Sequence, residues 1–187
     1  MRTNLERIPL IRISDNIQLK AILDIDAASL FSLMKEVYPL AYGHFWTDNG
    51  DWYVNMQYAT PHILKEVSAE NSEYYFVLFD DEIIGNLRFV WDEKLANLSD
   101  EKQVKLHRIY LHKKTQGKGI GKAILSWLEK KAIQKGYHII WLDAMNEQTQ
   151  AFEFYKNQGY THHSHTFLPF DLMHKELRKM SQLFKKI

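Results

Sequence analysis

Three glycines within five positions are the part of this sequence whose residue types and spacing suggest chemistry. They lie in the stretch QGKGIGK, Gln116 to Lys122, which runs directly into an apolar pattern with helical spacing. Glycine lets the backbone approach a ligand closely, and the first N–H groups of a helix are unpaired donors at the positive end of its dipole. The stretch therefore predicts a phosphate-binding loop, with a plain strand-to-helix turn as the alternative.

The glycine spacing excludes two well-known nucleotide loops. A Walker loop requires glycine five residues before its Gly-Lys pair and Ser or Thr after it, but Gln116 and Ala123 stand at these positions. A dinucleotide-binding G-x-G-x-x-G motif does not fit either. Whether its first glycine is aligned with Gly117 or with Gly119, the position of the third glycine holds another residue. The pattern that fits is Q/R-x-x-G-x-G/A, formed by Gln116, Gly119 and Gly121.

The elements around this loop alternate between strands and helices. Two apolar runs about Asp80 and Asp81 predict an antiparallel hairpin, and Thr60 with Pro61 predicts the N-cap and first position of a short helix. Further strands are expected over residues 8–14, 104–112, 138–144 and 160–168, and helices over 24–42, 60–67, 121–136 and 148–159. The last stretch, residues 171–186, favours a strand over a helix.

This order predicts a single α/β (α+β) domain over residues 1–187, with a hairpin meander followed by strands that alternate with helices. The sheet is expected to be mixed and mostly antiparallel, with six to seven strands flanked by about four helices. The glycine loop then lies at the C-terminal end of a central strand, where open α/β sheets bind ligands.

The composition gives no reason to expect a nucleic-acid or membrane partner. The 187 residues include 24 basic and 23 acidic side chains and are 45% hydrophobic. No cysteine is present, which excludes disulfides, thiolate metal sites and a cysteine nucleophile. The beginning of the chain has neither a long apolar core nor a small-residue cleavage site, so a soluble, cytoplasmic protein is expected.

A second motif, AFEFYKNQGY (residues 151–160), follows about 30 residues after the glycine loop. With both motifs, the hairpin, and the strand RIYLHKKT before the loop, the chain resembles the GCN5-related N-acetyltransferases. The resemblance implies that the loop binds the pyrophosphate of acetyl-CoA, the acetyl donor. Within the family, HRIYLHKKTQGKGIGK, IIWLDAMNEQTQAFEFYKNQGY and the pair Asp171-Leu172 are similar to the bacterial PaiA-type spermidine/spermine N-acetyltransferases, which implies a small amine or polyamine as acceptor.

The resemblance also implies roles for individual residues. Tyr155 matches the family's general acid, and Leu111 matches the position whose backbone contacts pantetheine. His107 stands where the polyamine enzymes carry a proton-relaying glutamate, and imidazole, with an ordinary pKa near ~6.5, is suited to act as the base. The alternatives are a histidine packed under a helix and a water relay as the base. Strand alternation predicts that His107 shares a face with Ile109 and Leu111. The expected acetyl-CoA site comprises Ile109, Leu111, Gln116, Gly117, Lys118, Gly119, Ile120, Gly121, Lys122 and Gln148, the last in place of the subgroup's asparagine.

An aromatic-rich segment, YPLAYGHFWTDNGDWY (residues 38–53), is the remaining clue to the acceptor. Aromatic faces and carboxylates attract cationic amines through cation–π contacts and charge pairing. The expected acceptor-binding residues are Tyr38, Trp46, Asp48, Trp52 and Tyr53. The alternative is a hydrophobic cluster under the sheet, in which the two aspartates are ordinary turn residues.

These observations predict direct attack of a small-molecule amine on the thioester, because no cysteine is available for an acyl-enzyme. No metal is expected, although His163 and His165 alternate on one strand. A protein, peptide or amino-sugar amine is an alternative acceptor. A catalytically silent acetyl-CoA-binding regulator and a non-enzymatic interaction domain are alternative functions, and a monomer and a homodimer are both open.

Overall fold

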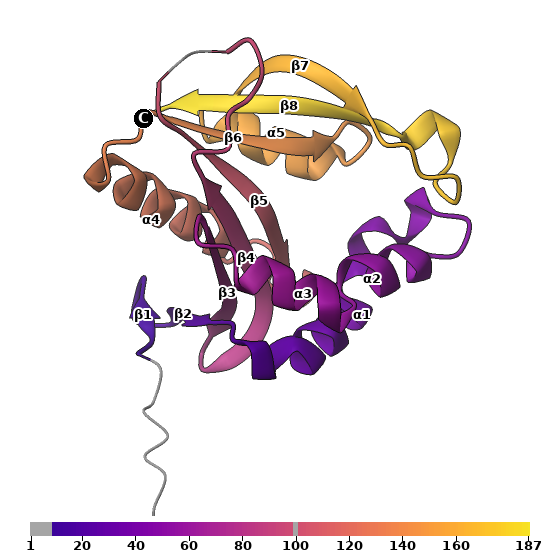
Figure 1. Cartoon of the computed structure of the whole chain (residues 1–187), viewed down its shortest axis with the longest axis horizontal. Coiled ribbons are helices and arrows are strands. Elements are labelled where there is room, and N and C mark those ends of the chain that lie inside the picture. Colours follow the sequence, from indigo (N-terminus) through magenta and orange to yellow (C-terminus); the bar gives the residue numbers. More distant parts are fainter. Residues whose placement is uncertain (1–8, 99–100) are drawn as a thin grey trace, which may run out of the picture.

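The computed structural model describes residues 9–98 and 101–187, and an eight-stranded sheet with the order β1-β2-β3-β4-β5-β6-β8-β7 forms its centre (Figure 1). The strands are β1 (Ile11–Arg12), β2 (Ile17–Ala21), β3 (Ser72–Phe79), β4 (Glu82–Trp91), β5 (Gln103–Leu111), β6 (Ile139–Met145), β7 (Thr161–Phe167) and β8 (Lys179–Lys186). The α-helices are α1 (Ala27–Tyr42), α2 (Asp51–Gln57), α3 (Thr60–Val67), α4 (Ile120–Gln134) and α5 (Thr149–Asn157). Short 3₁₀ helices are η1 (Asp24–Asp26), η2 (Gly43–Phe45), η3 (Lys113–Thr115) and η4 (Lys175–Leu177).

The predicted fold class is confirmed, including the hairpin about Asp80 and Asp81, while the numbers of elements are slightly larger than expected. The pattern predicts no element at β2 or α2. β2 has the sequence IQLKA, in which apolar and polar residues alternate and Ile17 and Leu19 are buried, so a short strand signal was present and was missed. α2 begins within the aromatic segment, directly after Gly50, whose φ is +84°, and extends beyond it to Gln57.

Several predicted boundaries are wrong in detail. The cap of α3 is Ala59, because Thr60 is already helical and Pro61 is the second residue of the helix. The strand expected over 8–14 is reduced to β1, and Ile8 lies outside the described residues. In the stretch 171–186 only β8 is a strand, and η4 precedes it.

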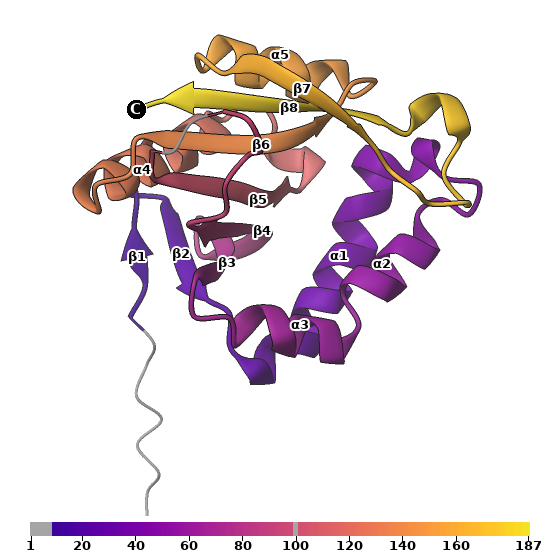
Figure 2. The ribbon, with the colours of Figure 1, turned by 45° about the horizontal axis from the view of Figure 1, so that its top comes forward.

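The sheet is buried on both faces, which explains the long apolar runs of its central strands. In β3, Tyr75 and Val77 face the core under α4, whereas Tyr74, Phe76 and Leu78 face the core under α1–α3. Figure 2 shows α1, α2 and α3 gathered on one side of the strands and α4 on the other. Among the described residues, no helix is both long and apolar enough to cross a membrane.

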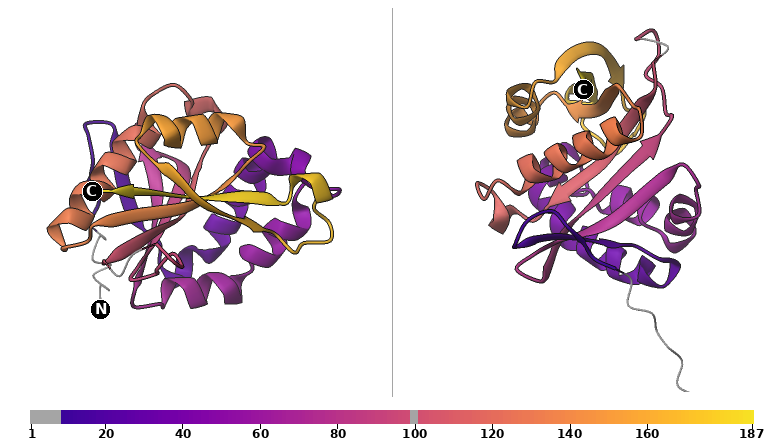
Figure 3. Two further views of the ribbon diagram at one scale, coloured as in Figure 1. Left: turned by 90° about the horizontal axis from the view of Figure 1, so that it is seen from above. Right: turned by 90° about the vertical axis from the view of Figure 1, so that its left-hand side faces the viewer.

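The sheet splits between its two parallel neighbours, β5 and β6. Their pairing covers only Gln103–Lys105 and Ile139–Trp141, although both strands continue beyond these residues. Along its other edge, β6 pairs over its whole length with the antiparallel β8, and α5 packs on β6. Figure 3 shows this C-terminal half of the sheet beside the half that carries α4. The C-terminal ends of β5 and β6 therefore diverge, and the glycine loop follows one of them.

A buried charge cluster attaches α3 to the sheet. Glu66 of α3 forms ion pairs with Arg88 of β4, at 3.3 Å, and with Arg108 of β5. The three side chains are at most 9% exposed, and Gln57 of α2 accepts a further hydrogen bond from Arg108 at 3.2 Å. One carboxylate thus balances two buried guanidinium groups.

We expect Glu66→Gln to destabilise the fold by about 3 kcal/mol, because the amide keeps the volume but leaves two buried cations without a counter-charge. Glu70→Gln is the control, since Glu70 is exposed in the turn that follows α3. This substitution should shift the free energy of unfolding by less than about 0.5 kcal/mol. Urea titration followed by circular dichroism measures both. Equal midpoints for the two variants would contradict this account of the cluster.

Candidate active site

The glycine loop connects the end of β5 to the start of α4 in the conformation that its glycines permit. Gly117 and Gly119 have φ values of +78° and +74°, which side chains with a Cβ rarely adopt. Gly119 is the N-cap of α4, and the first helical hydrogen bond runs from the N–H of Ala123 to the carbonyl of Gly119. The N–H groups of residues 120–122 precede that bond and are directed out of the helix end.

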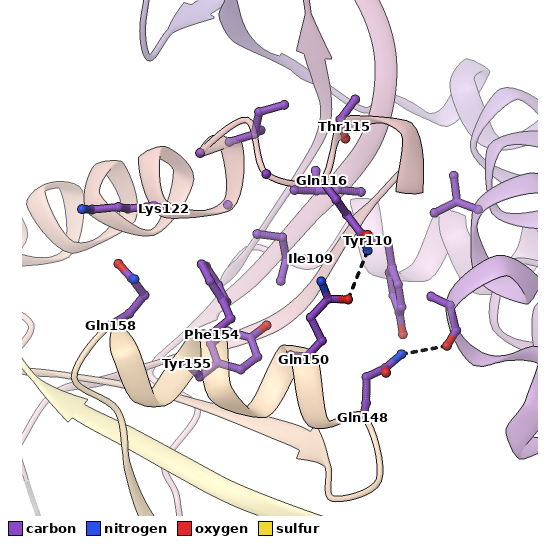
Figure 4. Close-up of a pocket in the computed structure, with 18 of the residues that line it drawn as sticks. Ile109, Tyr110, Thr115, Gln116, Lys122, Gln148, Gln150, Phe154, Tyr155 and Gln158 are labelled. Atoms are coloured by element: carbon purple, nitrogen blue, oxygen red, sulfur yellow. Dashed lines mark hydrogen bonds between the residues drawn. The ribbon is translucent and has the colours of Figure 1, made fainter.

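A cleft of about 490 Å³ opens beside this loop, between α4, α5, β5 and the end of α1 (Figure 4). Its lining residues are Val37, Ala41, Tyr42, Ile109, Tyr110, Leu111, Thr115, Gln116, Gly117, Gly119, Ile120, Gly121, Lys122, Gln148, Gln150, Ala151, Phe154, Tyr155 and Gln158. Lys122 and Gln158 lie toward one end in Figure 4, and Gln148 and Tyr110 toward the other. The cleft therefore runs from the helix terminus to α1.

The structure brings nearly all of the predicted acetyl-CoA residues together. Nine of them line the cleft: Ile109, Leu111, Gln116, Gly117, Gly119, Ile120, Gly121, Lys122 and Gln148. Lys118 is the exception, because its ammonium lies 4.8 Å from the ring centre of Phe79 on β3. A role for its side chain in cofactor binding stays a prediction.

Tyr155 also lines the cleft, on the face of α5 that is directed toward β5. Its side chain is buried and packs edge-to-face on Phe154 and Tyr160, with ring centres 5.3 and 5.7 Å away. Burial raises the pKa of Tyr155 above its ordinary value, and the nearby Tyr42 adds to the shift. The hydroxyl is therefore protonated at neutral pH and can donate a proton or hydrogen bond into the cleft.

Gln148 spans the far end of the cleft. Its Nε2 donates a 2.7 Å hydrogen bond to the carbonyl of Ala41, a residue 107 positions earlier at the end of α1 (Figure 4). The bond joins the N-cap of α5 to α1. Gln148 therefore holds two walls of the cleft at a fixed separation.

His107 does not line the cleft, although it lies on the same strand as Ile109. The register between β4 and β5 shifts after Arg88, which leaves His107 as the extra residue of a β-bulge. The regular alternation behind its predicted orientation is therefore broken. Burial and the positive charges of Arg108, Arg88, Lys105 and His62 lower the pKa of His107 to about 2, so the imidazole is neutral at working pH.

The residues predicted to bind the acceptor form part of a packed cluster instead of lining this cleft. Tyr38 and Trp46 are buried; the indole N–H donates a 3.0 Å hydrogen bond to the Tyr38 hydroxyl, and Tyr53 stacks on Tyr38 at 4.7 Å. Trp52 packs 6.0 Å from Trp46.

The two aspartates of this segment are engaged in local structure. Asp48 accepts hydrogen bonds from the backbone N–H groups of Gly50 and Trp52, at 3.1 and 2.7 Å, at the start of α2. Asp51 forms a 3.1 Å ion pair with Lys35. Their arrangement corresponds to the turn alternative from the sequence.

Sequence reasoning missed the part of the cleft that α1 provides and, on α5, the lining residues other than Tyr155. Val37, Ala41 and Tyr42 lie on one face of α1 and reach the cleft only through tertiary packing, for which the sequence carries no local signal. Phe154 was available in the second motif, and its ring closes on Gly121, where an added Cβ would lie 3.1 Å from it.

The histidines on β7 are arranged differently from the prediction. A register shift between β7 and β8 makes His163 an extra residue, so His162, not His163, lies beside His165, with nitrogens 3.3 Å apart. No group of three or more candidate metal ligands occurs within the described ranges 9–98 and 101–187.

Comparison with known proteins identifies relatives for most of the chain. The model of the family described as the acetyltransferase (GNAT) family matches residues 28–160. A curated relative, an uncharacterized N-acetyltransferase in the pepI 3′ region of Lactobacillus delbrueckii subsp. lactis, is 30% identical over 104 residues, or 55% of this chain. That match spans only 60% of the relative's own length.

Two solved structures resemble the whole fold. The PaiA N-acetyltransferase from Thermoplasma acidophilum, in complex with coenzyme A, has a TM-score of 0.70 at 19% identity and covers 91% of this chain and 99% of its own. The Salmonella typhimurium acetyltransferase that modifies the N-terminal serine of ribosomal protein L7/L12 has a TM-score of 0.69 at 12% identity, covering 96% and 99%. At these identities the likeness shows a shared fold.

We expect Gln148→Ala to lower the free energy of unfolding by about 1 kcal/mol, because it removes the hydrogen bond between the α5 cap and Ala41. Gln150→Ala is the matched control, since Gln150 is exposed and its contact with Gln116 is 3.5 Å long. Gln150→Ala should change the free energy of unfolding by about 0.3 kcal/mol at most. Denaturant midpoints measure both, and an equal loss in the two variants would assign no bridging role to Gln148.

Proposed function

The chain belongs to the acetyltransferase (GNAT) family, and from this premise we propose that it transfers an acetyl group from acetyl-CoA to a primary amine. The observation that carries the proposal is the cleft between the glycine loop and Tyr155. The glycine-loop wall of the cleft offers backbone donors at a helix terminus, which suit a pyrophosphate, and the α5 wall offers apolar side chains with a protonated hydroxyl.

Three parts of the cleft fit acetyl-CoA. The backbone between Gln116 and Gly121 would bind the pyrophosphate, and Lys122 would contribute a positive charge. β5 has no strand partner on its β6 side beyond Lys105 within the described chain, so the backbone near Ile109 and Leu111 can pair with an extended pantetheine arm. When bound, acetyl-CoA supplies an acyl group activated as a thioester.

The reaction is proposed as a direct transfer, since the sequence has no cysteine to form an acyl-enzyme. The amine nitrogen forms a bond to the thioester carbonyl carbon, the carbon–sulfur bond breaks, the nitrogen loses a proton and the sulfur gains one. Tyr155 is the proposed donor of the proton to sulfur, because it lines the cleft and its raised pKa keeps it protonated. His107 remains only a predicted base, since its lowered pKa makes it a weak proton acceptor.

A polyamine acceptor follows from the sequence resemblance and is supported by the fold shared with PaiA. The similar fold of the enzyme that modifies an N-terminal serine supports a peptide amine equally well. Asp48 and Asp51 lend no support to a polycation, because a helix start and Lys35 already engage them. A primary amine is therefore the acceptor class on which the proposed function rests.

Gly119→Val should abolish measurable binding of acetyl-CoA, because a β-branched residue is strained at φ +74° and distorts the phosphate loop. Gly136→Val is a matched control at the other end of α4: Gly136 also has φ +74°, and an added Cβ there meets no atom within 4 Å. We expect a similar loss of stability in both variants and wild-type affinity only in Gly136→Val, as measured by calorimetric titration. Wild-type affinity in a folded Gly119→Val protein would rule out this loop as the phosphate site.

Tyr155→Phe should lower kcat by about 100-fold while leaving the Kd of acetyl-CoA within about twofold, because only proton donation is lost. A raised pKa keeps the acid form present as pH rises, so the wild type should show no loss of kcat from Tyr155 ionisation between pH 8 and about 10. Tyr160→Phe, a buried tyrosine outside the cleft lining, is the control and should retain wild-type kcat. Wild-type kcat in Tyr155→Phe would exclude Tyr155 as the acid.

Two measurements test the proposed function as a whole. Acetyl-CoA should raise the Tm of the full chain, and an amine panel should release free CoA only in the presence of an acceptor. Binding without turnover on any amine would indicate a regulator that senses acetyl-CoA. No binding at all would indicate a non-enzymatic interaction domain.

A further inference from the structure

The ionisable side chains that line the cleft are all groups with a high ordinary pKa. The described residues that line it include four such side chains, Tyr42 of α1, Tyr110 of β5, Tyr155 of α5 and Lys122 of α4. No aspartate, glutamate or histidine is among these described lining residues. Every ionisable side chain facing the cleft therefore comes from a residue type that normally holds its proton at pH 7.

Burial strengthens this character of the three tyrosines. It raises the pKa of Tyr42 to about 12 and also raises the pKa of Tyr110 and of Tyr155, with the nearby Tyr53 adding to the first two shifts. A raised pKa means that a phenol remains protonated to higher pH. These hydroxyls can donate protons or hydrogen bonds, but they cannot take up the proton of an ammonium group.

One histidine and one carboxylate that adjoin lining residues in the sequence, His112 and Glu36, are paired with each other. His112 follows the lining residue Leu111, and Glu36 precedes the lining residue Val37. The Nδ1 of His112 accepts a 3.0 Å hydrogen bond from the backbone N–H of Lys114, and its Nε2 lies 3.0 Å from the Glu36 carboxylate. Nε2 is then the protonated nitrogen, so this imidazole has no free lone pair.

His107 is no better placed to remove a proton from an amine. It does not line the cleft, and the nearby positive charges of Arg108, Arg88 and Lys105 oppose a second proton on its ring. Among the described residues that line the cleft, no side chain can take up the proton of an ammonium group, so we infer that an amine reacts there after arriving neutral or losing its proton to water.

This requirement separates amines by their own pKa. The α-amino group of a peptide has a pKa of about 7.7–8.0, so roughly one molecule in ten is neutral at pH 7. An alkylamine such as the lysine ε-amine has a pKa of about 10.4, so only about one in 2,500 is neutral. The supply of reactive amine thus differs by roughly 10² to 10³.

We propose that the acceptor is the α-amino group of a peptide or amino-acid amide, and not an alkylamine or polyamine. The proposal rests on the acetyltransferase function proposed above and on the absence of a base among the described residues of the cleft. The lone pair of the neutral α-amine forms the nitrogen–carbon bond, and the carbon–sulfur electron pair leaves with sulfur. The surplus proton on nitrogen passes to water, and sulfur receives a proton from Tyr155, which water then restores.

The test compares three acceptors on the full chain with saturating acetyl-CoA, by mass spectrometry of the acetylated product. They are dipeptide amides with varied first residues, Nα-acetyl-lysine amide, which has only the ε-amine, and spermidine. At pH 7 we expect kcat/KM for the best dipeptide amide to exceed that of both alkylamines by at least about 30-fold. At pH 10 the gap should shrink to within about tenfold, because about a quarter or more of each alkylamine is then neutral.

Either alkylamine acting as well as the dipeptide amides at pH 7 would overturn the proposal. So would an acid limb with a midpoint between about pH 6 and 7 in the alkylamine profile that disappears in His107→Asn or His112→Asn, because it would identify an enzymatic base. A chain that binds acetyl-CoA and turns over none of the acceptors would instead contradict the proposed function itself. A chain that does not bind acetyl-CoA would also contradict the proposed function, at the step of cofactor binding.

Discussion

Hydrogen bonding between β5 and β6 stops after three residue pairs, and the candidate site depends on this early end. Two parallel strands need a crossover, which α4 provides, so the N-terminus of α4 must lie at the end of β5 where the strands diverge. β8 pairs with the whole of β6 along the edge that faces away from β5, so β6 stays in the sheet beyond the point where its bonds to β5 end. The split thus leaves a strand edge, a helix terminus and a cleft in one place.

Three contacts attach the helices α1–α3 and their flanking turns to the rest of the molecule, and α1 in turn forms one wall of the cleft. Glu66 joins α3 to β4 and β5 through Arg88 and Arg108, while Gln148 joins α5 to the end of α1. The β7–β8 connection adds a third contact, where His174 donates a backbone hydrogen bond to the carbonyl of Phe45. Because α1 supplies one wall, these distant bonds determine which side chains reach the site.

The parts of the molecule that could be predicted from the sequence are those with local causes. The turn at Asp80 and the loop at Gly119 depend on residues within a few positions, and both are where the pattern predicts them. The orientation of His107 could not be predicted, because the bulge arises from the pairing of β5 with β4. The role of Asp48 could not be predicted either. Its carboxylate accepts a hydrogen bond at the start of α2, a helix that the sequence pattern does not reveal.

The distribution of donors in the cleft follows the charges that an acyl transfer from a thioester produces. Backbone N–H groups and Lys122 line the wall proposed for the pyrophosphate, which is anionic throughout, and Tyr155 lines the α5 wall, where it is the proposed donor to a sulfur that becomes anionic. Donors on both walls favour negative charge and disfavour binding of an ammonium ion. In the proposed reaction such a site aids departure of the leaving group, and the acceptor amine supplies its own lone pair.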